Sequence, residues 1–155
     1  MTKTSKSLSA VATVDVELER ALEGLFRLGA NRRFESRQTA AVGAVVTRAG
    51  YAALRALADH GTLSLRALAE QSAMDAAAAS RQVAALVDEG LVERTASNGD
   101  ARAVDLTLTD HGREVYARIA AYRLSHLTGV LDGWTTDEKA TLAELVTRLS
   151  DALAG

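Results

Sequence analysis

The segment 62–112 constrains the fold more than any other part of this chain of 155 residues. Apolar residues recur every three or four positions in two short stretches, 65–71 and 76–89, which is the spacing of amphipathic helices. Ser64 and Asp75 stand directly before these stretches, and both residue types favour the N-cap position. The sequence therefore predicts two consecutive helices joined by a tight turn.

A two-stranded hairpin is predicted directly after the second helix. Gly90 is placed to end that helix in the left-handed conformation that glycine tolerates best. Short strands are predicted at 91–95 and 104–108, and the polar tip between them, 96–101, contains an Asn-Gly pair that favours a hairpin turn. The predicted fold class is mainly α with a small β-hairpin wing.

Further helical patterns flank this segment and carry long apolar stripes. Helices are predicted at 9–33, 47–60, 110–128 and from 135 or 136 to 153, with a buried connection at 39–46. The outermost stripes are too far apart in sequence to be buried by local contacts, so they must pack on each other, on the central segment or on a second copy of the chain. A two-fold dimer is the commonest closed arrangement. We therefore divide the chain into a disordered N-terminus (1–8), a helical dimerisation region (9–38 and 110–155) and a winged helix-turn-helix module (39–109).

Composition excludes several classes of function. The chain has no cysteine, so disulfides and thiolate metal sites are excluded, and its three histidines are too scattered to predict a metal site. No apolar run is long enough to span a membrane, and the N-terminus lacks a secretory leader, so we expect a cytoplasmic protein. No nucleophile–base set or phosphate-binding loop is present, so neither an enzyme nor a cofactor is expected.

The charge balance of the central module leaves two functions open. Between residues 61 and 105 the sequence has four arginines and seven acidic residues, a net charge of 4 − 7 = −3. Binding to DNA depends on cations that face the phosphates, so placement matters more than this sum. The alternative is a winged-helix protein-interaction module that has lost DNA binding, which the acidic balance supports.

The chain resembles the MarR family of bacterial transcription regulators over nearly its whole length. The resemblance is carried by VTRAGYAALRALADHG at 46–61, LSLRALAEQSAMD at 63–75, SRQVAALVDEGLVER at 80–94 and GDARAVDLTLTDHGRE at 99–114. It implies a homodimer joined through its terminal helices that binds double-stranded DNA at a pseudo-palindromic operator. It also implies release of the DNA by a small, often aromatic, ligand, so we expect a ligand-responsive repressor.

In this setting the helix at 76–89 is the expected recognition helix, whose first half enters the major groove. Ser80, Arg81 and Gln82 carry polar side chains that can reach the edges of the bases, with Arg81 suited to guanine and Gln82 to adenine. The family usually has Ser or Thr where this chain has Ala77 and Ala78, so contacts from hydroxyl groups are lost there. The alternative for all five residues is an ordinary solvated helix face.

The predicted wing supplies a second group of DNA contacts. Arg102 is expected to enter a narrow minor groove, where the electrostatic potential is most negative. Asp100 is expected to hold the wing in shape by pairing with Arg102 or Arg94, and the family's second basic residue is replaced by Ala101. A surface ion pair of little energetic value is the alternative.

Two further sets of residues complete the candidate site. Contacts to the phosphate backbone are expected from the helix start and from exposed arginines, namely Ser64, Arg66 and Arg48. Aromatic side chains that are candidates to line a ligand cavity are Tyr51, Tyr122 and Trp134, each of which is otherwise an ordinary core residue.

Overall fold

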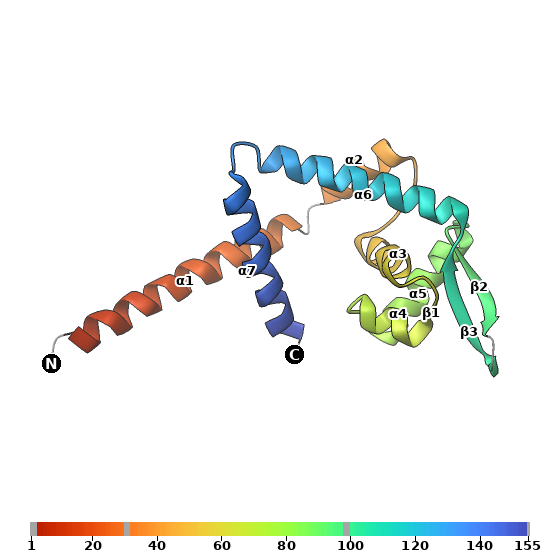
Figure 1. Ribbon diagram of the computed structural model, residues 1–155, viewed down its shortest axis with the longest axis horizontal. Helices are drawn as coiled ribbons and strands as arrows, with labels where there is room; N and C mark the ends of the chain where they lie inside the picture. Colours follow the sequence, from red (N-terminus) through yellow and green to blue (C-terminus); the bar gives the residue numbers. More distant parts are fainter. Residues whose placement is uncertain (1–2, 30–31, 98–99, 155) are drawn as a thin grey trace.

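The protein is described by a computed structural model that covers residues 3–29, 32–97 and 100–154. It is mostly helical, with one small antiparallel sheet, as the sequence predicts (Figure 1). The elements are α1 (Lys3–Gly29), α2 (Arg32–Val42), α3 (Arg48–His60), β1 (Leu63–Ser64), α4 (Leu65–Gln71), α5 (Ala76–Asp88), β2 (Val92–Ser97), β3 (Asp100–Leu108), α6 (Asp110–Val130) and α7 (Thr136–Ala154).

Helices α3, α4 and α5 and the sheet form the winged module. The strands lie in the order β1-β3-β2, so the long strand β3 pairs on both sides, with Leu63 and Arg94 both opposite Leu106. The hairpin β2–β3 extends beyond the helices at the edge of the molecule (Figure 1). This arrangement confirms the predicted helix, turn, helix and wing.

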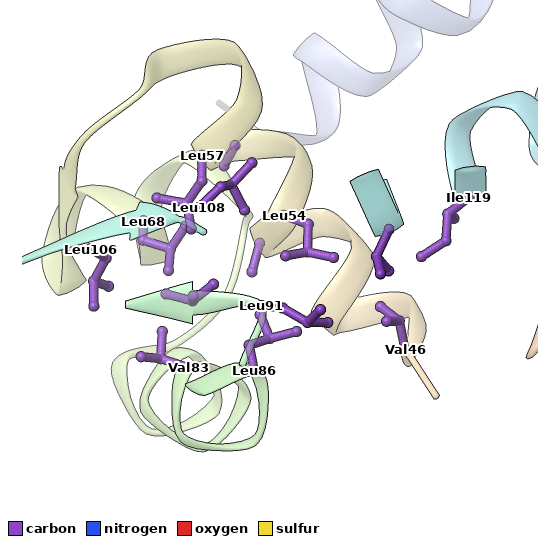
Figure 2. Close-up of a cluster of buried hydrophobic side chains, with 14 of the residues drawn as sticks. Val46, Leu54, Leu57, Leu68, Val83, Leu86, Leu91, Leu106, Leu108 and Ile119 are labelled. Atoms are coloured by element: carbon purple, nitrogen blue, oxygen red, sulfur yellow. The ribbon is translucent and has the colours of Figure 1, made fainter. Parts of the chain in front are cut away.

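One apolar core holds the module together and extends to α6. Figure 2 shows leucines from α3, α4 and α5 meeting the strand residues around Leu91 and Leu106. Ile119 of α6 is also fully buried, so the first half of that helix packs on the module. The helical spacing of Leu54 and Leu57 explains why both side chains point into this core.

The two predicted N-caps, Ser64 and Asp75, are confirmed, and two further threonines cap α3 and α6 in the same way. Each cap residue adopts an extended backbone and its side-chain oxygen accepts a hydrogen bond from the backbone N–H three residues later. The donor–acceptor distances run from 2.7 Å for Asp75 to 3.2 Å for Ser64. The cap residues are Thr47, Ser64, Asp75 and Thr109.

The start of α6 is locked to the end of α5. The hydroxyl of Thr109 donates to the carbonyl of Gly90 at 2.7 Å and accepts from the N–H of Gly112 at 2.9 Å. The N–H of Thr109 also donates to the carbonyl of Leu91 at 3.1 Å. Gly90 has a φ of +69°, as predicted for the residue that ends the helix. Helices α5 and α6 therefore cannot separate at this joint without breaking the two hydrogen bonds that Thr109 makes to Gly90 and Leu91.

The structure corrects the predicted N-terminal part of the chain. The single helix expected at 9–33 begins earlier, at Lys3, so most of the segment 1–8 is helical rather than disordered. Nothing in residues 3–8 breaks a helix, since they include no glycine or proline. The expected connection at 39–46 is also wrong in its first half, because α2 continues to Val42 and ends before Gly43, which has a φ of +73°.

The wing strands are longer than predicted. Strand β2 continues to Ser97 and β3 already begins at Asp100, so the tip is shorter than 96–101. The register shifts between Ala96 and Ser97 because the strand carries an irregularity there. The Asn98-Gly99 turn itself lies outside the described residues.

The outer helices leave large apolar side chains exposed. Helices α1 and α7 extend away from the winged module and make no extended packing with it (Figure 1). Exposed apolar side chains on the outer helices include Val14, Leu18, Leu25, Phe26, Leu127, Val130, Leu145 and Val146. Within the described residues, no helix is both long and apolar enough to cross a bilayer.

Candidate nucleic-acid interface

The first half of α5 presents an open polar face. Ala77, Ser80 and Arg81 are exposed, whereas Ala79 is buried against the core. Ala78 is half-buried, so it lies at the border between these two faces. The predicted reading residues Ser80 and Arg81 are therefore both accessible, and small alanines beside them permit close approach of another molecule.

The structure brings α5 and the base of the wing together. A hollow of about 190 Å³ is lined by Ser80 and Val83 of α5 and by Arg94 of β2. Neither Arg81 nor Arg94 has an ion-pair partner among the residues that the structure describes. Helix α5 and strand β2 thus each present one arginine that no described acid neutralises.

Two predicted phosphate contacts already have partners within the chain. Arg66 forms an ion pair with Glu70, at 2.9 Å between Nε and the carboxylate. The hydrogen bond to Glu70 is the main cause that raises the pKa of Arg66 above its ordinary value. The hydroxyl of Ser64 accepts the capping bond from Ala67, which leaves its own proton available for a phosphate.

Gln82 is engaged inside the protein rather than extended towards an external base. Its side chain is half-buried, and its Oε1 accepts a hydrogen bond of 2.9 Å from the hydroxyl of Thr47. Arg48 follows Thr47 at the start of α3 and is exposed. The predicted contact of Gln82 with adenine thus competes with a bond that joins α5 to α3.

For two of the predicted wing residues, Asp100 and Arg102, the structure describes only the backbone. Asp100 and Arg102 belong to β3, but their side chains lie outside the described part of the structure. The predicted pairing of Asp100 with Arg102 or Arg94 therefore stays a prediction, as does the minor-groove contact. An exposed carboxylate, that of Asp75, stands at the N-terminus of α5 and opposes a nearby phosphate.

A cluster of aromatic rings fills the junction of α2, α3 and α6. The guanidinium of Arg123 lies 4.3 Å from the ring centre of Tyr51 and 5.3 Å from that of Phe34. Phe34 also contacts Tyr122, with ring centres 5.9 Å apart. Two predicted ligand-lining residues, Tyr51 and Tyr122, therefore meet here, around a cation rather than around an empty cavity.

Trp134, the third predicted ligand-lining residue, lies elsewhere. It is 44% exposed and borders a surface hollow with residues of α7, including Leu142 and Leu145. The structure does not place it beside the other two aromatic residues, because α6 continues for about two further turns beyond Tyr122 before the chain reverses. A single cavity lined by all three residues is not formed in the described chain.

Sequence reasoning missed several members of the junction. Tyr116, Ile119 and Arg123 follow one another at helical spacing along α6, so an arginine on the inward face was the signal available. Tyr116 stacks on Tyr51 with ring centres 5.8 Å apart. Gln38 gave no signal, because a single glutamine in a polar stretch is ordinarily exposed.

Comparison with known proteins identifies relatives of the chain. A sequence profile of the MarR family matches residues 46–104, which include α3, α4, α5 and most of the wing. The HTH-type transcriptional regulator YxaD of Bacillus subtilis is 32% identical over 105 residues, which cover 68% of this chain and 73% of that protein.

Two solved structures are similar over most of the fold. The PcaV transcriptional regulator from Streptomyces coelicolor, solved in complex with its natural ligand, is 26% identical with a TM-score of 0.68, covering 92% of this chain and 96% of its own. Bordetella bronchiseptica BpsR, whose DNA binding is regulated by 6-hydroxynicotinic acid, is 25% identical with a TM-score of 0.62, covering 77% of this chain and 89% of its own.

Proposed function

Because this chain belongs to the MarR family of transcriptional regulators, and is thus a DNA-binding regulator, we propose that it is a ligand-responsive repressor acting as a homodimer. Its recognition helix is α5, and its operator is pseudo-palindromic because two copies related by a two-fold axis read two equivalent half-sites. The half-sites lie about one helical turn of DNA apart, ~34 Å.

The accessible face of α5 is the observation that carries the proposal. Ser80 and Arg81 are exposed on α5, Ser80 shares a hollow with Arg94 of the wing, and neither arginine is neutralised by a described acidic partner. An arginine on this face can donate two parallel hydrogen bonds to one guanine. Arg102 is the proposed minor-groove residue, since it belongs to the strand that leads from the wing tip.

The outer helices support a dimer. Apolar residues of α1 and α7 such as Phe26 and Leu145 are exposed, and burying such area stabilises association by about 25 cal/mol per Å². A second copy of the chain carries the same stripes, so it is the partner whose surface matches.

The ligand site is proposed at the junction of α2, α3 and α6. PcaV is described with a natural ligand and BpsR with 6-hydroxynicotinic acid, which is a small aromatic acid. In this chain Arg123 supplies a cation between the rings of Tyr51 and Phe34. A planar aromatic anion is the ligand class that fits such groups.

A salt-titrated DNA-binding assay on the region beside the protein's own gene tests the regulator proposal. The wild type is expected to bind one site with an affinity that falls steeply as salt is added. Arg81→Ala and Arg102→Ala are expected to weaken binding roughly 5- to 150-fold, as for loss of a base contact. Arg55→Ala is the control, since that exposed arginine pairs with Asp59 on α3 and is expected to leave the affinity unchanged.

The acidic balance of the module keeps the protein-interaction alternative in the test. If selection from the whole genome gives no binding site, or if binding is insensitive to salt, the interaction module becomes the better description. Tight binding whose salt dependence becomes less steep in both arginine variants contradicts that alternative, because an apolar protein interface does not depend on released counterions.

A further inference from the structure

A line of hydrogen bonds begins at Arg123 on α6 and crosses α2. Its NH1 donates to Oε1 of Gln38 at 3.2 Å, and Nε2 of Gln38 donates to the carbonyl oxygen of Val46 at 3.5 Å. The second bond is long, but Gln38 is only 1% exposed, so its amide has no access to bulk water. A buried amide without partners is costly, and these two bonds use both of its ends.

The line continues from the start of α3 to the recognition helix. Thr47 follows Val46 directly, and its hydroxyl caps α3 by accepting from the N–H of Gly50 at 2.9 Å. The same hydroxyl donates to Oε1 of Gln82 on α5, also at 2.9 Å. One threonine thus joins the helix that Gln38 holds to the helix that faces DNA.

Gly50 shows how closely these groups are packed. A Cβ added at this position would lie 3.3 Å from Oγ1 of Thr47, 3.3 Å from a methyl group of Val46 and 3.5 Å from Oε1 of Gln82. Val46, Thr47 and Gln82 therefore all meet over the Cα of Gly50, and the glycine leaves just enough room for the hydrogen bond between Thr47 and Gln82.

The guanidinium of Arg123, where this line of hydrogen bonds begins, is held in one orientation. It stacks between two aromatic rings, and the planar group keeps its orientation in a way that a lysine ammonium does not. Burial is the main cause that lowers its pKa from the ordinary value, yet an arginine stays charged in proteins. Its hydrogen-bond donors therefore remain available to Gln38.

We propose that Gln38 and Arg123 are positioning residues for DNA recognition, which set the placement of α5 through Val46, Thr47 and Gln82. The functional part of this inference rests on the proposed DNA binding. Gln82 is then a positioning residue too, and not a reader of adenine. An aromatic anion bound to Arg123 draws the guanidinium away from Gln38, and this links the proposed ligand site to the recognition helix.

Two kinds of effect on DNA binding separate positioning from base reading. A residue that reads one base loses discrimination at one base pair of each half-site when it is truncated. Truncation of a positioning residue weakens binding at several base pairs together. Truncation of a buried residue that cannot touch DNA gives the same profile across base pairs. Gln38→Met and Gln82→Ala are therefore compared on the operator and on its single base-pair variants.

The expected result is a loss of roughly 3- to 10-fold in operator affinity for each variant, as for one hydrogen bond, with matching base-pair profiles and unchanged affinity for unrelated DNA. The double variant is expected to lose less than the product of the two single losses, because both act through one line. Arg123→Lys is measured in the same assay as a third variant. Its control is Arg118→Lys, at an exposed position of α6, which is expected to bind DNA as the wild type does. Loss confined to one base pair in Gln82→Ala, with wild-type binding by Gln38→Met, would overturn the inference.

A measurement without DNA keeps this test independent of the proposed function. The side-chain amide resonances of Gln82 are followed by NMR in the free full-length protein. Arg123→Lys and Gln38→Met are expected to shift them, and Arg118→Lys is expected to leave them in place. Unchanged Gln82 resonances in Arg123→Lys would overturn the inference, whereas shifted resonances in a protein that binds no operator would overturn the proposed function alone.

Discussion

Gly112 shows how a single residue is required by space rather than by backbone conformation. A Cβ at this position would overlap the carbonyl oxygen of Leu91 and would lie 2.8 Å from the carbonyl carbon. The neighbouring atoms belong to the backbone at the end of α5, so no side chain can rotate to make room. Gly129, in the same helix, has nothing within 4 Å of an added Cβ.

This pair of glycines gives a matched prediction for stability. Gly112→Ala is expected to lower the free energy of unfolding by about 3 kcal/mol or more, because overpacking forces the backbone of α5 and α6 apart. Gly129→Ala is expected to raise it by about 0.5–1 kcal/mol, since alanine favours the helix over glycine. Urea unfolding of both variants at one protein concentration checks this, and equal midpoints would contradict it.

Residues with a local role were predictable from the sequence, and those with a role across the fold were not. Ser64 and Asp75 were identified as caps because a cap needs only a short polar side chain before a helical pattern. The engagement of Gln82 by Thr47 joins residues 35 positions apart in the chain. Arg123 and Gln38 are 85 positions apart, and only the folded chain brings them together.

At the scale of elements, α7 is the helix whose start is most fully defined by its own residues. The carboxylate of Glu138 accepts from the N–H and from the hydroxyl of Thr135, both at 2.8 Å, while the hydroxyl of Thr135 accepts from the N–H of Glu138. This is a capping box, in which each residue satisfies a backbone donor of the other. The hydrogen bond from the Thr135 backbone is the main cause that lowers the pKa of Glu138 below the model-compound value of 4.5.

A pH dependence follows for the stability of α7. The folded pKa of Glu138 is below its unfolded value, so the contribution of its carboxylate is complete above pH 4.5 and is lost as the pH falls through the lowered folded pKa. Glu138→Gln is therefore expected to unfold at a lower temperature than the wild type at neutral pH. This difference is expected to shrink towards zero in acid, which thermal melts followed by circular dichroism can check; a constant difference would contradict it.

Element boundaries were less predictable than element types at the N-terminal end of the chain. The sequence 9–33 indicated one helix, but Gly29 ends α1 and a second helix, α2, follows on arginine, glutamate and glutamine. Polar helices of this kind lack the apolar stripe by which periodicity is recognised. Helix α2 is nevertheless the element that contributes Phe34 and Gln38 to the junction with α6.

At the scale of the whole molecule, the exposed stripes of α1 and α7 determine the predicted assembly. Leu145→Glu places a charge in the proposed interface, and the protein is expected to become monomeric and to lose operator binding. Thr147→Glu is the control, because Thr147 lies on the polar face of α7 with Glu144 and Asp151. Analytical ultracentrifugation of both variants decides the matter, and a dimeric Leu145→Glu protein would exclude α7 from the interface.

The contacts of Thr109 and Gly112 with the residues that follow α5 hold the winged module rigidly at one end of α6. A rotation of α6 therefore moves the whole module. The 21 residues of α6 span about 32 Å at a rise of 1.5 Å per residue. A tilt of α6 by about 6° about its far end therefore displaces the winged module by about 3 Å. This is close to the rise of one base pair, ~3.4 Å, so a small angular change at the outer helices is enough to shift α5 by one base-pair step along the proposed operator.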